Sequence, residues 1–162
     1  MVKIKVLALL LICNIAMANY TNPSVNRLIQ SNNDPVGVIF ELIETDKNTW
    51  EWAAPMIEDL RIQLKDKYPN IEIAVVSHGR EQFQLLKRRS EKHPKAMSIL
   101  EDLVRKENVN LYVCGTHSSW FNIEPSNYMD IVDVAESGPA KINDYINLGY
   151  QSIKLSKPIQ TK

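Results

Sequence analysis

Cysteine is scarce in this chain, whose 162 residues include only Cys13 and Cys114. The two do not form a C-x-x-C pair, which excludes a thioredoxin-type dithiol mechanism. Cys114 and His117 could share a metal ion, but a structural zinc site needs four ligands, and too few lie nearby in the sequence. The sequence therefore predicts neither a dithiol centre nor a metal site, and it indicates no cofactor.

Glycine is also scarce, and the five glycines form neither a G-x-G-x-x-G sequence nor a Walker motif. The chain thus lacks the two best-known glycine-rich signatures of nucleotide-phosphate sites. It also has no excess of basic charge, because 19 lysines and arginines balance 19 aspartates and glutamates. This balance argues against a general binder of nucleic acids or anionic membranes.

Long apolar runs are missing, and the run Val6–Ile12 is too short to span a bilayer. It follows two lysines and precedes Ala16-Met17-Ala18, an order typical of a secretory signal peptide cleaved after residue 18. A retained anchor or a lipoprotein signal at Cys13 is the alternative, although a bulky isoleucine precedes that cysteine. We therefore expect a periplasmic or secreted protein that has no membrane association after cleavage.

Cleavage at that point would leave Cys114 as the one cysteine of the mature protein. An exported protein with a single cysteine cannot form an internal disulfide. The odd thiol therefore suggests either chemical reactivity or intermolecular pairing. The alternative is an inert, buried thiol that packs as a small hydrophobic side chain.

Short apolar segments alternate with amphipathic ones along the rest of the chain. Strands are expected at 36–40, 71–76, 109–114 and 131–134, with a fifth, edge strand at 152–155. Helices are expected at 46–68, from 81 to about 104 with an interruption at His93-Pro94, and after Ser137. Strands that are almost entirely apolar and alternate with helices predict a parallel sheet between two helix layers. Residues 19–34 are polar and rich in turn residues, so we expect a flexible arm there, and we expect a frayed tail at 159–162.

The helix at 46–68 carries a clear buried stripe that begins at Trp50. Trp52 and Met56 fall on another face, where they are either exposed singly or form a subunit contact. In the last helix, Ile142, Tyr145 and Ile146 are expected to face inward. The segment 116–128 is aromatic and irregular.

Two residues whose side chains can take part in catalysis are expected at the carboxyl ends of neighbouring strands. This is where open parallel sheets bind ligands. His78 follows the second strand and Cys114 ends the third. Backbone amides after Gly115 can favour the thiolate form of Cys114, and so can positive charge from a protonated His78 or from Arg80. A glycine after the nucleophile also lets the backbone approach closely.

Each neighbouring residue has a plainer interpretation as well. His78 can be a hydrogen-bonded structural histidine, and His117 can take its chemical role or be a solvated loop residue. Basic residues also cluster between the second and third strands. They can form a solvated helix face, or they can draw small anions toward the site. The cluster comprises Arg80, Lys87, Arg88, Arg89, Lys92 and Lys95.

Two strand ends, Val75-Val76-Ser77-His78-Gly79 and Leu111-Tyr112-Val113-Cys114-Gly115, resemble those of the DsrE/DsrF-like (YchN-like) sulfur-relay family. The segment from Val132 to Gly138, the apolar helix after it, and Leu148-Gly149-Tyr150 through Lys154 are similar to that family's closing segment. The resemblance covers roughly residues 35–158. It implies a flavodoxin-like three-layer α/β/α domain with a mostly parallel sheet of about five strands.

The resemblance also implies a function. Members of the family carry sulfur on a cysteine as a persulfide and usually assemble as homotrimers or hexamers. Cys114 would be the nucleophile, with His78 as its partner. The substrate pocket would include Gly79, Arg80, Gly115, Thr116, His117 and Trp120. The partners would be a small sulfur donor and an acceptor protein thiol. The alternatives are a non-catalytic oligomeric binding or assembly module of the same fold, and a redox-sensing thiol protein.

Overall fold

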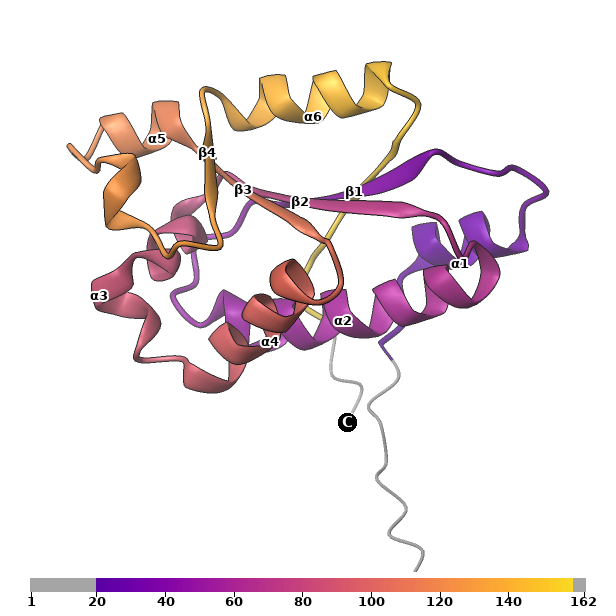
Figure 1. The fold of residues 1–162 in the computed structure, drawn as a ribbon, viewed down its shortest axis with the longest axis horizontal. Helices are drawn as coiled ribbons and strands as arrows, with labels where there is room; N and C mark the ends of the chain where they lie inside the picture. Colours follow the sequence, from indigo (N-terminus) through magenta and orange to yellow (C-terminus); the bar gives the residue numbers. More distant parts are fainter. Residues whose placement is uncertain (1–19, 159–162) are drawn as a thin grey trace, which may run out of the picture.

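Five short strands form one sheet in the computed structural model, which describes residues 20–158 (Figure 1). The strands are β1 (Gly37–Leu42), β2 (Glu72–Ser77), β3 (Asn110–Cys114), β4 (Asp133–Ala135) and β5 (Gln151–Lys154). All neighbours pair in parallel in the order β4-β3-β2-β1-β5. Helices cover both faces, so the prediction of a three-layer α/β/α domain of the flavodoxin-like class is confirmed. The expected signal segment, Cys13 and the tail at 159–162 lie outside the described residues.

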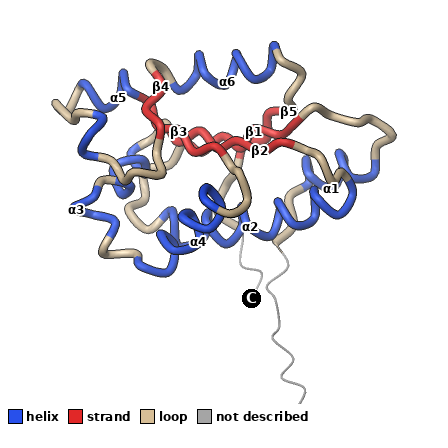
Figure 2. The backbone as a smooth tube through the Cα atoms, viewed as in Figure 1, coloured by secondary structure: helices blue, strands red, loops and turns tan. Residues whose placement is uncertain are grey.

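The two faces of the sheet bury very different amounts of apolar surface. Alternate residues of β1 point to opposite faces, with Phe40 in a large core and Ile39 in a small one. Helices α2 (Thr49–Lys67) and α4 (Pro94–Arg105) cover the large core, and α6 (Gly138–Asn147) crosses the other face (Figure 2). Burial on both faces explains why the central strands are apolar almost throughout.

Helix α2 forms where its sequence predicts, but Trp52 and Met56 are buried, with 9% and 3% of their surface exposed. They are therefore neither exposed nor free for a subunit contact in this chain. The reason is that α2 packs between α1 (Pro23–Gln30) and α4, so more than one of its faces is covered. The single-stripe interpretation of this helix was wrong.

The expected flexible arm at 19–34 contains helix α1. Asn22 caps the helix by accepting hydrogen bonds from the backbone N–H groups of Ser24 and Val25, and Val25 is fully buried. The hydroxyl of Tyr68, the residue that caps the end of α2, donates to the Leu28 carbonyl at 2.7 Å. The expectation of a loose arm was therefore wrong for 23–30, because one buried valine and a cap suffice to dock a two-turn helix.

The connection from β2 to β3 begins with a 3-10 helix, η1 (Arg80–Leu85), in place of the expected α-helix, and continues through α3 (Lys87–Ser90). Every residue from Glu81 to Leu85 is buried, including three polar ones. Pro94 then starts α4 at its first position, as the interruption at His93-Pro94 predicted.

The segment after β3 is also more regular than expected. It contains helix α5 (Gly115–Ser119) and a 3-10 turn, η2 (Pro125–Asn127), before β4. In α6, Ile142 is buried and Tyr145 is half-buried, but Ile146 is 45% exposed, so the inward placement of Ile146 was wrong.

The connections that leave β3 and β4 pass to different layers. The segment after β3 packs Tyr128 and Ile131 into the large core, whereas the segment after β4 becomes α6 on the opposite face. In open parallel sheets, such a divergence leaves a crevice at the carboxyl ends of the two strands. Cys114 is the last residue of β3 and therefore lies at this point.

Candidate functional site

Cys114 lies between β3 and α5, and it is the free cysteine of the described residues. Its side chain is only 5% exposed, but it lines a pocket of about 410 Å³ at the carboxyl ends of the strands. Residues from both sides of the crevice complete this pocket, among them Ser137 and Pro139 at the start of α6. The thiol therefore has limited access to solvent through a defined opening.

The backbone of α5 contacts the sulfur directly. Cys114 caps α5, and the N–H group of His117 donates to Cys114 Sγ at 3.4 Å. N–H groups at a helix start carry partial positive charge, which favours an anionic sulfur over a neutral thiol. The expectation that an amide after Gly115 points at the sulfur is confirmed for the His117 amide, and its effect on the thiolate stays a prediction.

Gln82 fixes the backbone of Cys114 from beneath. Its Oε1 accepts a hydrogen bond from the Cys114 N–H at 2.8 Å, and the side chain is fully buried. Its Nε2 has no hydrogen-bond partner among the described residues. The sequence carries no signal for this role, because a glutamine in a polar segment is ordinarily exposed.

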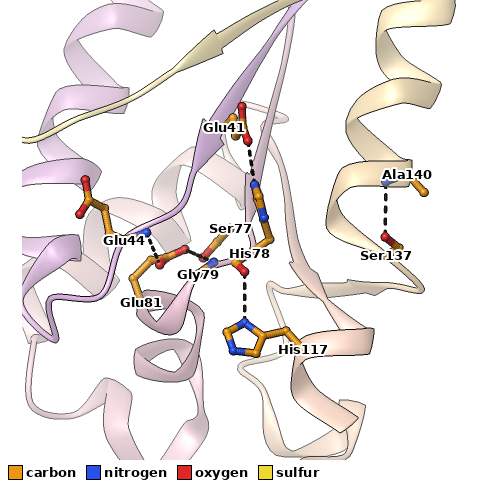
Figure 3. A network of polar contacts seen from close by, with 9 residues as sticks. All are labelled: Glu41, Glu44, Ser77, His78, Gly79, Glu81, His117, Ser137 and Ala140. Atoms are coloured by element: carbon orange, nitrogen blue, oxygen red, sulfur yellow. Dashed lines mark hydrogen bonds and ion pairs between the residues drawn. The ribbon is translucent and has the colours of Figure 1, made fainter. Parts of the chain in front are cut away.

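The His78 imidazole points toward Glu41 of β1 (Figure 3). Its Nε2 lies 2.9 Å from Glu41 Oε1, and no hydrogen bond joins it to Cys114 within the described residues. Glu41 lies on the sheet face that α6 covers because it alternates with Phe40 and Leu42 of the large core, and His78 continues the alternation of Ala74 and Val76 of the small core. This geometry gives the His78 ring a hydrogen-bond partner on β1, and the support of the thiolate by its charge stays a prediction.

The His117 ring is held at the end of β2. Its Nδ1 lies 3.1 Å from the His78 carbonyl oxygen (Figure 3). A carbonyl can only accept, so Nδ1 carries the proton, and the neutral ring has its lone pair on Nε2. His117 is the third residue of α5, and Cys114 is the N-cap of that helix. The Phe83 and Trp120 rings hold the imidazole at centroid distances of 4.9 and 5.3 Å.

The pocket includes nearly all of the predicted site residues. Those that line it together are His78, Gly79, Arg80, Cys114, Thr116, His117 and Trp120. Gly115 does not line it; a Cβ there would lie 2.9 Å from the Ala135 carbonyl oxygen of β4, so this glycine permits close packing of α5 on β4. Trp120 is 71% exposed at the pocket, whereas Phe121 faces a neighbouring groove and does not shield the sulfur.

A buried carboxylate joins the loops on the β1 and β2 side of the pocket. Glu81 is fully buried and accepts hydrogen bonds from the Glu44 N–H, the Ser77 hydroxyl and the Gly79 N–H at 2.7 to 2.9 Å (Figure 3). Burial raises the pKa of this carboxyl above its ordinary value, while the hydrogen bonds oppose the rise. Sequence reasoning missed Glu81 because its donors come from two different strand ends.

No described residues form a group of three His, Cys, Asp or Glu side chains that could hold a metal ion. Within 20–158, no helix is both long enough and apolar enough to cross a membrane.

The comparisons with known proteins bear on the fold. The chain matches no protein-family model and no curated protein. Its structure is similar to that of a protein of unknown function, MTH1491 from Methanobacterium thermoautotrophicum, with a TM-score of 0.59 and 19% sequence identity. The match covers 73% of this chain and 97% of that one. At this identity the likeness shows a shared fold, in agreement with the parallel five-stranded sheet between helix layers.

Proposed function

We propose that this chain is an exported sulfur carrier that binds sulfane sulfur as a persulfide on Cys114 and passes it to an acceptor thiol. One observation carries the proposal. The free cysteine of the described chain stands at the divergence of the β3 and β4 connections, receives a backbone N–H on its sulfur, and lines a pocket. This is an arrangement that favours a reactive thiolate. The sequence resemblance to the sulfur-relay family adds support.

The transfer needs no cofactor. His117 Nε2 accepts the thiol proton, and the Cys114 thiolate attacks the outer sulfur of a donor such as thiosulfate. The new S–S bond forms at Sγ as the donor's S–S bond breaks, and sulfite leaves with the electron pair. An acceptor thiolate then attacks the terminal sulfur, and Cys114 leaves as a thiolate. The amide of His117 stabilises the anionic sulfur before and after each transfer.

Intact-mass spectrometry after exposure to thiosulfate tests this proposal. The wild-type chain is expected to gain the mass of one sulfur atom, and reductant is expected to remove it. Cys114→Ser is expected to gain none. An equal gain in Cys114→Ser, or no gain in the wild type with either thiosulfate or polysulfide, contradicts the proposal.

The burial of Cys114 favours a second candidate, a non-catalytic oligomeric binding or assembly module in which the thiol only packs. Alkylation kinetics separate the two functions. An activated thiol reacts with iodoacetamide faster than free cysteine at neutral pH, and a packing thiol reacts more slowly. A redox-sensing thiol would instead give a disulfide-linked dimer that reductant dissolves.

Export, and assembly as a trimer or hexamer, are part of the proposal. Size-exclusion chromatography with light scattering measures the assembly state.

A further inference from the structure

A second groove, of about 520 Å³, lies beside the Cys114 pocket and carries four basic side chains, Lys47, Arg80, Arg88 and Arg89. No acidic side chain lines it. Within the described part of the chain, none of the four forms an ion pair, whereas the adjacent Lys87 pairs with Asp130 at 2.8 Å. The groove therefore concentrates uncompensated positive charge on a chain whose total charge is balanced.

Apolar rings form another part of the groove. Phe121 is 49% exposed and packs edge-on against Phe83 at a centroid distance of 5.1 Å, with the Arg80 guanidinium 6.0 Å from the Phe121 ring centre. Arginine and aromatic side chains together are typical of surfaces that bind protein segments. A small inorganic anion would use the charges and leave the rings uncovered, so the combination favours a larger ligand that has both acidic and apolar groups.

The groove and the Cys114 pocket adjoin each other. Thr45 and Arg80 line both of them, so η1 contributes to each wall, and Phe121 and Ile123 of the groove follow α5, which contributes Thr116 and His117 to the pocket. An extended chain that lies in the groove can therefore continue past Arg80 to Cys114 without leaving the surface. The exposed Trp120 also lines the Cys114 pocket, where that path ends.

We propose that this basic groove, lined by Lys47, Arg80, Arg88, Arg89 and the two phenylalanines, binds an acidic, extended segment of the acceptor protein and brings its thiol to Cys114. Arginine clusters recognise acidic motifs through charge-assisted hydrogen bonds, and charge complementarity speeds docking. This inference rests on the sulfur-carrier function proposed above, and it names the chemistry of the partner: acidic residues and one apolar residue near a reactive cysteine.

Binding of a synthetic peptide tests the groove without any sulfur chemistry. The probe is a fluorescein-labelled peptide with four acidic residues, one leucine and a terminal cysteine, measured by anisotropy against full-length Cys114→Ser. Lys47→Glu/Arg88→Glu is expected to weaken binding about tenfold or more, since both side chains are exposed and each reversal places like charges together. Lys92→Glu/Lys95→Glu makes the same charge change outside the groove and is expected to leave binding within about twofold. Circular dichroism and melting curves confirm that the variants fold.

The control peptides and variants define what overturns the inference. Equal weakening by both double variants means non-specific attraction, and displacement of the peptide by sulfate at matched ionic strength means a small-anion site; either result overturns it. If thiosulfate loads Cys114 but the acidic peptide does not bind, the groove proposal fails while the carrier function stands. If the peptide binds as expected but Cys114 takes no sulfur, the carrier function fails and the groove remains a binding site for an acidic segment.

Discussion

Gly138 packs directly against both His78 and Cys114. A Cβ at this position would lie 2.6 Å from His78 Cβ and 3.3 Å from Cys114 Cβ. The first residue of α6 thus lies against Cys114, between the pocket-lining residues Ser137 and Pro139, and a side chain there would clash. The clash is one of space, because a methyl group has nowhere to go between a strand end and a helix start.

Gly138→Ala is therefore expected to lower the free energy of unfolding by about 1–3 kcal/mol, as overpacking in a closed site does. The start of α6 must move, so the alkylation rate of Cys114 should change as well. Urea denaturation and iodoacetamide kinetics measure the two effects. Asn143→Ala, on an exposed part of the same helix, is the control and should change neither. Unaltered stability and reactivity in Gly138→Ala would show that the site tolerates a side chain there.

At the level of single residues, sequence reasoning found the residues with evident chemistry and missed those that hold them. The position of Cys114 at a strand end, and its pocket neighbours, followed from the parallel-sheet pattern. Glu41, Gln82 and Glu81 could not be found in this way. Their roles depend on burial between elements that are remote in sequence, and no local pattern records which polar side chain is buried.

Glu81 connects three elements, because it belongs to η1 and accepts hydrogen bonds from the end of β2 and from the loop after β1. In Glu81→Gln, an NH2 group replaces one of the two carboxylate oxygens. This group can only donate, so it faces a donor from which the oxygen accepted a hydrogen bond. The loss of at least one of these hydrogen bonds, with a buried donor left unpaired, is expected to cost about 1–3 kcal/mol at neutral pH.

The pH dependence of stability follows from the same carboxyl group. Burial raises the folded-state pKa of Glu81 above its ordinary 4.5. The stability that it contributes is thus fully present below pH 4.5 and is lost as the pH rises through the folded-state pKa. The difference in unfolding free energy between wild type and Glu81→Gln should therefore shrink as the pH rises above 4.5, which urea titrations at several pH values measure. A difference that grows over this range would contradict the assignment.

Among the elements, the strands and the long helix were predictable because hydrophobic periodicity marks them strongly. Helix α1 and η1 were not, for opposite reasons. Helix α1 is short and mostly polar, and it is held by Val25 and a side-chain cap. The η1 segment is rich in polar residues but is buried. Its Glu81 and Gln82 side chains form hydrogen bonds with groups near strand ends, and not with solvent. Trp52 was misplaced because neighbouring helices decide how many faces of α2 are covered.

The described part of the molecule is asymmetric, since α6 is the helix that packs across one face of the sheet, whereas α2 and α4 cover the large core on the other. The small core beneath α6 consists of Ile39, Ala74 and Val76 of the sheet and Ile142 of the helix. The same helix begins at the Cys114 pocket, with Ser137, Gly138 and Pro139. The packing of the small core and the shape of the Cys114 pocket are therefore coupled through helix α6.

Ile142→Ala tests this coupling. Removal of a buried isoleucine side chain is expected to lower the free energy of unfolding by about 2–4 kcal/mol. Because Ile142 anchors the helix that walls the pocket, Cys114 alkylation should also become faster at urea concentrations well below the unfolding midpoint. Asn147→Ala, at an exposed position near the other end of α6, should alter neither property. If Ile142→Ala loses stability while Cys114 keeps its wild-type reactivity, α6 stabilises the sheet without controlling access to the thiol.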